Sequence, residues 1–130
     1  MGRLLIVDDA MLMRRMIRDV ALEAGWEVVG EAKDGREGVD LFGQLRPDLV
    51  TLDVVMPEMG GLDALRLIRE IDPEARVVMV TALDQKATIE EAIRAGALDF
   101  IVKPFERARI SNLLGKLGAP RASRASTPAS

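Results

Sequence analysis

Five short apolar runs, separated by longer stretches of helical period, constrain the fold of this chain more than any other feature. The runs are residues 4–7, 28–32, 49–52, 77–80 and 100–102. They are rich in β-branched residues and, apart from Glu31, continuously apolar rather than alternating, which is typical of strands that are covered on both faces. The sequence therefore predicts buried strands at these positions.

Apolar residues recur three and four positions apart between the runs, as on the buried face of an amphipathic helix. Gly25 and Gly96 follow two of these stretches at positions typical of helix C-caps. We expect Met11, Met13 and Met16 to fill gaps in the core. The predicted buried helix positions are Leu12, Met16, Val20 and Ala24; Val39, Phe42 and Leu45; Leu65, Ile68 and Ile71; Ile89, Ala92 and Ile93; and Ile110, Leu113, Leu114 and Leu117.

Strands that alternate with helices predict an α/β fold with a parallel sheet. We expect a doubly wound five-stranded sheet in the order 2-1-3-4-5, a flavodoxin-like (βα)5 sandwich with helices on both faces. Residues 1–118 are predicted to form this one domain. Residues 119–130 contain only Ala, Arg, Ser, Thr and Pro, and we expect a disordered tail or linker there.

The composition excludes several classes of chemistry. The chain has no cysteine and no histidine, which excludes thiolate catalysis, zinc–thiolate sites and an internal phosphohistidine. Its formal net charge of −3 argues against direct nucleic acid binding. No apolar run is long enough to span a membrane, so we expect a cytoplasmic protein without membrane contact.

Polar residues follow the apolar runs at their carboxyl ends. Asp8 and Asp9 follow the first run, Asp53 the third, Thr81 the fourth and Lys103 the fifth. Carboxyl ends of parallel strands meet at one edge of a sheet, and ligands bind there where the strand order reverses. We therefore expect these side chains to surround one pocket, whereas residues with unrelated structural roles would be scattered over both edges.

This set of side chains suits the acceptance of a phosphoryl group. Three carboxylates repel one another and need a proton or a cation, and an all-oxygen site favours Mg²⁺. A carboxylate such as that of Asp53 can attack phosphorus to form an aspartyl phosphate. Lys103 would then pair with the phosphoryl group, and the Thr81 hydroxyl would donate to one of its oxygens.

Each of these residues also has a simpler interpretation. Asp8 or Asp9 could cap the helix that follows. Asp53 could be an ordinary turn residue. Thr81 could be an ordinary strand residue and Lys103 a solvated surface lysine. The coincidence of all of them at one predicted edge favours the functional interpretation.

The sequence resembles response regulator receiver domains of two-component signalling over about residues 2–118. Within that family it is most similar to the single-domain chemotaxis regulators called CheY, through residues 8–14 and 95–100. The motifs that carry the resemblance are residues 5–9, LIVDD; Asp53 with 56–61, MPEMGG; 80–82, VTA; and 100–105, FIVKPF.

The resemblance implies that a histidine kinase phosphorylates Asp53. It also implies that Asp9 binds Mg²⁺ directly, that Asp8 reaches the ion through water, and that the backbone carbonyl of Val55 completes the protein ligands. Lys103 is implied as the partner of the phosphoryl group. Self-phosphorylation and slow autodephosphorylation would be the only chemistry, so we do not expect a turnover enzyme.

The resemblance also implies a conformational switch made by Thr81 and Phe100. Phosphorylation adds nearly two negative charges and shifts a two-state equilibrium, which reshapes the face of the fourth helix, fifth strand and fifth helix. A downstream protein target is expected to dock on that face. Phe100 stands where chemotaxis regulators commonly have tyrosine.

Further positions near the predicted site carry expectations from the resemblance. The bond from Lys103 to Pro104 should be cis, and Gly61 should shape the loop beyond Asp53. Val55 and Leu83 are apolar where many relatives have polar groups that help to position hydrolytic water. We therefore predict that the Asp53 phosphate hydrolyses slowly for the family.

The sequence also allows other functions to be considered beside this one. The chain could be the receiver part of a larger regulator with an output domain. A phosphatase of the haloacid dehalogenase type needs a second acid two residues after its nucleophile, but Ala10 follows Asp8 and Val55 follows Asp53 at that offset. A flavin module would have only Trp26, and no tyrosine, to stack on the ring.

Overall fold

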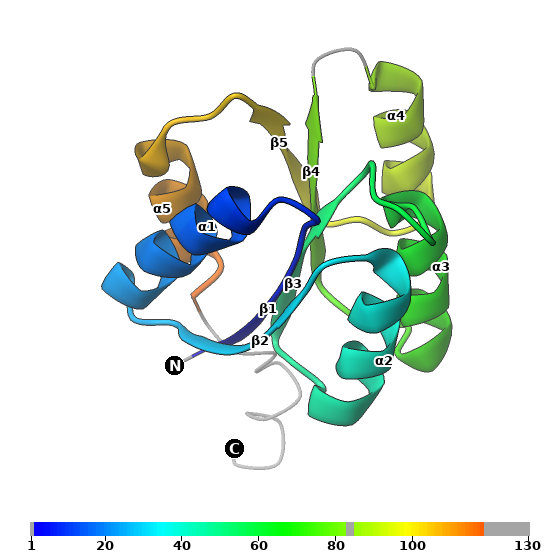
Figure 1. Ribbon diagram of the computed structural model, residues 1–130, viewed down its shortest axis with the longest axis horizontal. Coiled ribbons are helices and arrows are strands. Elements are labelled where there is room, and N and C mark those ends of the chain that lie inside the picture. Colours follow the sequence, from blue (N-terminus) through cyan, green and yellow to red (C-terminus); the bar gives the residue numbers. More distant parts are fainter. Residues whose placement is uncertain (1, 83–84, 119–130) are drawn as a thin grey trace.

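The computed structural model describes residues 2–82 and 85–118, within which five strands alternate with five helices (Figure 1). All of the predicted strands and helices are present. The elements are β1 (Arg3–Val7), α1 (Met11–Glu23), β2 (Glu27–Ala32), α2 (Gly35–Leu45), β3 (Leu49–Asp53), α3 (Gly61–Ile71), β4 (Val77–Ala82), α4 (Lys86–Arg94), β5 (Asp99–Lys103) and α5 (Arg107–Lys116).

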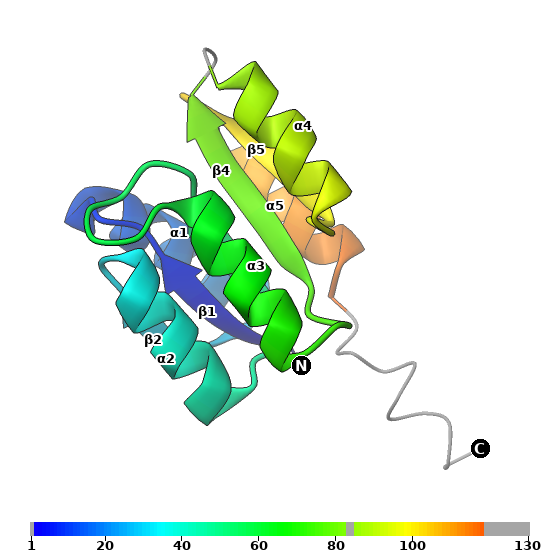
Figure 2. The same cartoon turned by 90° about the vertical axis from the view of Figure 1, so that its right-hand side faces the viewer.

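The strands form a single parallel sheet in the order β2-β1-β3-β4-β5, which confirms the predicted topology. α1 and α5 cover one face of the sheet, while α2, α3 and α4 lie over the other (Figures 1 and 2). The strand order reverses between β1 and β3, where Val7 lies opposite Leu52. Ligands of doubly wound folds bind beside this reversal.

Each face of the sheet has its own hydrophobic core. Phe42, Leu52 and Leu65 belong to the core beneath α2, α3 and α4. Ile6 and Trp26 belong to the core beneath α1 and α5. β3 is buried along its whole length, as expected for the central strand of a sheet that is covered on both faces.

Trp26 is part of the core and does not lie at the candidate site. Its side chain is 4% exposed, and its Nε1 donates a hydrogen bond to the carbonyl of Leu114 at 3.1 Å. The indole therefore joins the amino end of β2 to α5. This placement gives no support to the flavin hypothesis, which needed Trp26 to stack on a bound ring.

The sequence pattern predicts the buried face of α1 only in part: Val20 is buried as expected, but other predicted positions are not. Leu12 is 79% exposed and Ala24 is also exposed, although both were predicted to be buried. Met13 packs against the core and Met16 is half-buried, but Met11 is 61% exposed and is not a core residue. Apolar residues occupy more than one face of this helix, so periodicity alone did not select the face that contacts the sheet. The buried residues of α1 are Ile17, Val20 and Ala21.

The helix ends agree with the predicted caps. Gly25 and Gly96 have φ angles of 89° and 106°, in the left-handed region that favours glycine. The predicted tail at 119–130 and the position of Leu83 lie outside the described residues. No helix within the described part of the chain is long and apolar enough to cross a membrane.

Candidate functional site

Four strands deliver the predicted polar residues to one edge of the sheet. Asp8 directly follows β1, Asp53 and Lys103 are the last residues of β3 and β5, and Thr81 lies near the end of β4. The register places Asp53 opposite Val80 and places Thr81 one step from the pairing of Lys103 with β4. The predicted residues therefore share one edge, beside the reversal of strand order.

The three carboxylates of this edge form a tight cluster. Asp8, Asp9 and Asp53 each offer an oxygen, and these oxygens all lie within 4.8 Å of one another. Asp8 is 1% exposed and Asp53 is 4% exposed, whereas Asp9 is exposed to solvent. The site thus has a buried floor and one open side.

Lys103 is the cation that contacts the buried carboxylates. Its Nζ lies 3.2 Å from Oδ1 of Asp53, a hydrogen-bonding distance, and 3.6 Å from Oδ2 of Asp8. One ammonium group faces a cluster of three carboxylates, so the charges of this group do not balance. The lysine is not the solvated surface residue of the simpler interpretation.

Burial and mutual repulsion disfavour ionisation of the two buried carboxyl groups, those of Asp8 and Asp53. The pKa of Asp53 is raised from 3.8 to about 6, chiefly by burial and also by the negative charge of Asp8, while Lys103 opposes the rise. Burial also raises the pKa of Asp8, against the effect of the backbone N–H of Ala10 and the charge of Lys103. A bound cation would reverse both shifts, because it stabilises the ionised forms.

The donor set fits a hard divalent cation. Among the described residues, Oδ2 of Asp8 is one of few buried side-chain oxygens without a hydrogen-bond partner. A buried carboxylate oxygen of this kind needs a partner, and Asp9 and Asp53 supply further oxygens beside it. Oxygen ligands without imidazole or thiolate suit Mg²⁺.

The capping interpretation of the first two acids is wrong. The N-cap of α1 is Ala10, and no side chain caps the helix. Asp8 Oδ1 instead accepts a hydrogen bond from the N–H of Ala10 at 2.9 Å, which fixes the carboxylate at the start of the loop.

The loop beyond Asp53 requires glycine at one position. The N–H of Gly61 donates to the carbonyl of Val54 at 2.8 Å. A Cβ at position 61 would collide with the carbonyl oxygen of Asp53 and lie 2.8 Å from Cα of Val54. Val55 lies in this loop with a 63% exposed side chain. The Lys103–Pro104 peptide bond is cis, as expected.

Thr81 and Phe100 line one cavity between β4, β5 and the start of α4. The cavity has a volume of about 190 Å³, and Gln85 and Ile89 also line it. Thr81 is 2% exposed, and its hydroxyl donates to the carbonyl of Ala82 at 3.2 Å rather than to a carboxylate. Phe100 is half-buried and pairs with Met79 in the sheet.

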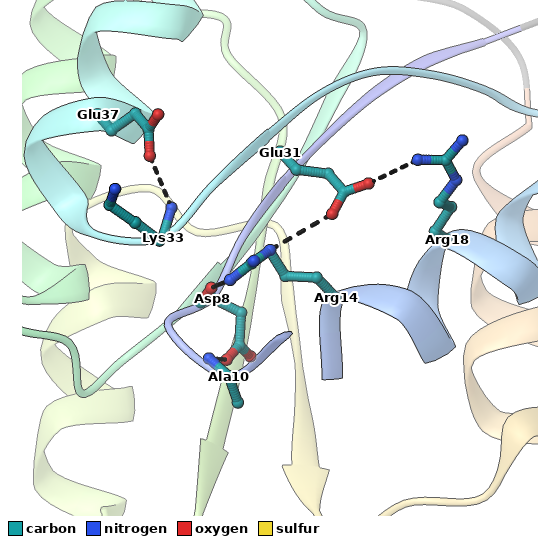
Figure 3. Close-up of polar contacts among 7 residues, drawn as sticks. All are labelled: Asp8, Ala10, Arg14, Arg18, Glu31, Lys33 and Glu37. Atoms are coloured by element: carbon teal, nitrogen blue, oxygen red, sulfur yellow. Dashed lines mark hydrogen bonds and ion pairs between the residues drawn. The ribbon is translucent and has the colours of Figure 1, made fainter. Parts of the chain in front are cut away.

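Two residues near the site were not anticipated from the sequence. Arg14 of α1 donates from Nη1 to the carbonyl oxygen of Asp8 at 2.7 Å, and Glu31 of β2 contacts Nε of the same arginine (Figure 3). Nothing in the sequence spacing links these positions, because their contact depends on how α1 packs beside β2.

Comparison with known proteins identifies the family. Residues 4–115 match the response regulator receiver domain. The chain belongs to this family. This match covers both the fold and the acidic edge described above.

The receiver domain is closely related to CheY chemotaxis proteins. It is 51% identical to that of Thermotoga maritima over 88% of this chain and 96% of the relative. It is 48% identical to that of Bacillus subtilis over 88% of this chain and 95% of the relative. Among solved structures it is similar to a CheX–CheY–BeF3–Mg complex from Borrelia burgdorferi, with a TM-score of 0.85, 32% identity, and coverage of 91% of this chain and 90% of that one.

Membership of this family bears on two questions, whether the chain is an enzyme and which kinds of partner it has. Receiver domains are not classical enzymes, which leaves the phosphatase alternative without support. A response regulator of this kind works with a histidine kinase and with downstream protein partners.

Proposed function

We propose that this receiver domain accepts a phosphoryl group on Asp53 from a histidine kinase and acts as a chemotaxis-type regulator. The observation that carries the proposal is the contact between Lys103 Nζ and Asp53 Oδ1 at 3.2 Å, within a cluster of three carboxylates. An ammonium group at this position can pair with the Asp53 carboxylate before phosphorylation. It can then pair with the phosphoryl group that becomes attached to this carboxylate.

The chemistry is a displacement at phosphorus. A carboxylate oxygen of Asp53 forms a bond to phosphorus while the bond from phosphorus to the kinase histidine nitrogen breaks, and the electron pair of that bond stays on the histidine. Asp8, Asp9, Asp53 and the backbone carbonyl of Val55 would hold Mg²⁺. When bound, this ion supplies positive charge that neutralises the phosphoryl oxygens.

The output of the proposal is a switch made by Thr81 and Phe100. Phosphorylation brings a new acceptor to the end of β3, and the Thr81 hydroxyl would exchange its bond to Ala82 for one to a phosphoryl oxygen. The cavity that Thr81 shares with Phe100 offers the ring space to move. A two-state equilibrium is thereby shifted.

The proposed docking face comprises α4, β5 and α5. A groove of about 470 Å³ lies between α4 and Phe100 of β5 on this face, and Ile93, which is predicted to be buried, is 44% exposed there. A downstream protein that inserts an apolar side chain would fit this groove. The residues that line it are Lys86, Ile89, Glu90, Ile93, Arg94 and Phe100.

The proposal also covers the further chemistry of the chain, the extent of the domain and its location in the cell. Self-phosphorylation by small phosphodonors and slow autodephosphorylation are the only chemistry, residues 1–118 form the receiver unit, and the location is cytoplasmic. A second candidate, a receiver unit within a larger regulator, uses the same site and the same chemistry.

Intact-mass spectrometry after incubation with acetyl phosphate and Mg²⁺ tests the proposal. The wild-type protein should gain the mass of one phosphoryl group, and Asp53→Asn should gain none. Phosphotransfer from a purified phosphorylated chemotaxis kinase should give the same contrast. An unchanged wild-type mass under both conditions would remove the central claim.

A further inference from the structure

We infer that Arg14 is a positioning residue that holds the Asp8–Asp9 loop in the geometry required for divalent ion binding, and that Glu31 orients Arg14. This inference rests on the proposed function, because it concerns the affinity of the acidic cluster for Mg²⁺. It assigns a role to two residues that do not themselves touch the proposed ion.

Three hydrogen bonds hold Asp8. Its N–H donates to the carbonyl of Ala32 at 3.0 Å, and its Oδ1 accepts from the N–H of Ala10 at 2.9 Å. Its carbonyl accepts from Nη1 of Arg14 at 2.7 Å, the shortest of the three contacts (Figure 3). Only Oδ2 is left without a hydrogen bond, and it faces Lys103 at 3.6 Å.

Glu31 fixes the guanidinium of Arg14 from the neighbouring strand. Its Oε1 lies 3.3 Å from Nε of Arg14, and its Oε2 lies 2.9 Å from Nη1 of Arg18 (Figure 3). The Arg14 side chain is 17% exposed, whereas that of Arg18 is 53% exposed. Exposed ion pairs contribute little to stability, because water screens their charges. Of the two arginines that contact Glu31, Arg14 is therefore the less screened.

The position of the contact explains its effect on the site. The carbonyl that Arg14 binds belongs to the peptide that joins Asp8 to Asp9, so a shift of this peptide turns both carboxylates. Both carboxylates are repelled by Asp53, and the repulsion tends to open the loop before a cation arrives. A cationic hydrogen bond from a side chain that is itself anchored opposes this movement.

Lysine cannot reproduce the arrangement. Arg14 donates from two different nitrogens, Nη1 toward Asp8 and Nε toward Glu31, and the planar guanidinium keeps these two directions fixed. An ammonium group on a flexible stem would reach one acceptor or the other. Substitution by lysine should therefore preserve the charge while losing part of the positioning.

Arg14→Met and Arg18→Met form a matched pair, because each removes one guanidinium that contacts Glu31 from the same helix. We expect Arg14→Met to raise the Mg²⁺ dissociation constant about tenfold, as is typical when the support of a metal ligand is lost. Arg18→Met should change it by less than about twofold, as for an exposed pair. Isothermal titration calorimetry with MgCl₂, and electron paramagnetic resonance with Mn²⁺, measure this directly on the unphosphorylated protein.

Phosphorylation by acetyl phosphate supplies a second readout. The Mg²⁺ concentration that gives half the maximal rate should rise with the dissociation constant in Arg14→Met, while the rate at saturating Mg²⁺ stays near that of the wild type. A purely structural role would lower the melting temperature without moving the Mg²⁺ affinity.

The outcomes separate this inference from the proposed function. If wild-type protein binds neither Mg²⁺ nor Mn²⁺, the proposed function fails and the inference fails with it. If the wild type binds Mg²⁺ and folded Arg14→Met binds it equally well, only the inference is overturned. Should Arg14→Met not fold, Arg14→Lys and Glu31→Gln take its place; intermediate affinities support the inference, and wild-type affinities in both overturn it.

Discussion

Lys103 Nζ lies 3.2 Å from Oδ1 of Asp53, which joins the ends of β5 and β3 although the two residues are 50 positions apart in sequence. The same ammonium group lies 3.6 Å from Oδ2 of Asp8. This single cation cannot neutralise three carboxylates, and the remaining negative charge is what a divalent cation would balance before a phosphoryl group is accepted.

Removal of the Lys103 charge should slow phosphorylation. Lys103→Met removes a donor aimed at the group where charge develops, and losses of this kind cost roughly a hundredfold in rate. We expect that effect on the rate of acetyl phosphate labelling at saturating Mg²⁺. Lys116→Met, at an exposed position on α5, is the control and should label at the wild-type rate. Similar rates for the two variants would contradict the role given to Lys103.

The stability of the metal-free protein should fall as the pH rises through the range in which Asp53 loses its proton. The pKa of Asp53 is raised from 3.8 to about 6 by folding, so the native state binds more protons than the unfolded state between these values. Asp53→Asn removes this effect and should be the more stable protein above the folded pKa, by on the order of 3 kcal/mol.

Urea denaturation in EDTA, carried out at a series of pH values, measures this difference. The wild type and Asp53→Asn should agree most closely below the ordinary pKa of an aspartate and diverge above the folded pKa. Added Mg²⁺ should narrow the gap, because it binds the ionised cluster of the native state. Parallel pH profiles for the two proteins would show that Asp53 is not perturbed in the way described.

Gly61→Ala should destabilise the protein and disturb the loop beyond Asp53. A Cβ there collides with the carbonyl oxygen of Asp53, and the backbone must shift to relieve the contact. Overpacking of this kind costs about 1–3 kcal/mol. The matched control is Gly115→Ala, since nothing lies within 4 Å of a Cβ at that position of α5. Alanine is the better helix former, so this control should be neutral or more stable by about 0.5 kcal/mol. Chemical denaturation of both variants decides the point.

A polar side chain at position 55 should shorten the lifetime of the Asp53 phosphate. Val55 is 63% exposed, so Val55→Asn should fold normally while it offers a group that can orient an attacking water. Loss of the phosphoryl group after removal of the donor, followed by intact mass, gives the lifetime. Leu98→Asn, at an exposed position before the opposite end of β5, should leave the lifetime unchanged. A lifetime that hardly moves in Val55→Asn would argue against this explanation for slow hydrolysis.

Much of the fold could be predicted because its signals are local. Each buried strand of a parallel sheet is a short apolar run, and each helix shows its own period, so the ten elements and the edge that carries Asp53 and Lys103 followed from the sequence. α1 was the exception. Met11 and Leu12 extend its apolar pattern beyond the face that contacts the sheet, and local periodicity does not distinguish the two faces.

The sequence by itself determined which residue types stand at the strand ends, and therefore which chemistry is possible at the site. Only the tertiary structure decided that Asp8 and Asp53 are buried while Asp9 is exposed, and that Arg14 contacts both the Asp8 carbonyl and Glu31. The reason is that burial and hydrogen bonds between elements depend on how helices and strands that are distant in sequence pack together. The local sequence pattern reports only the periodicity of each separate element.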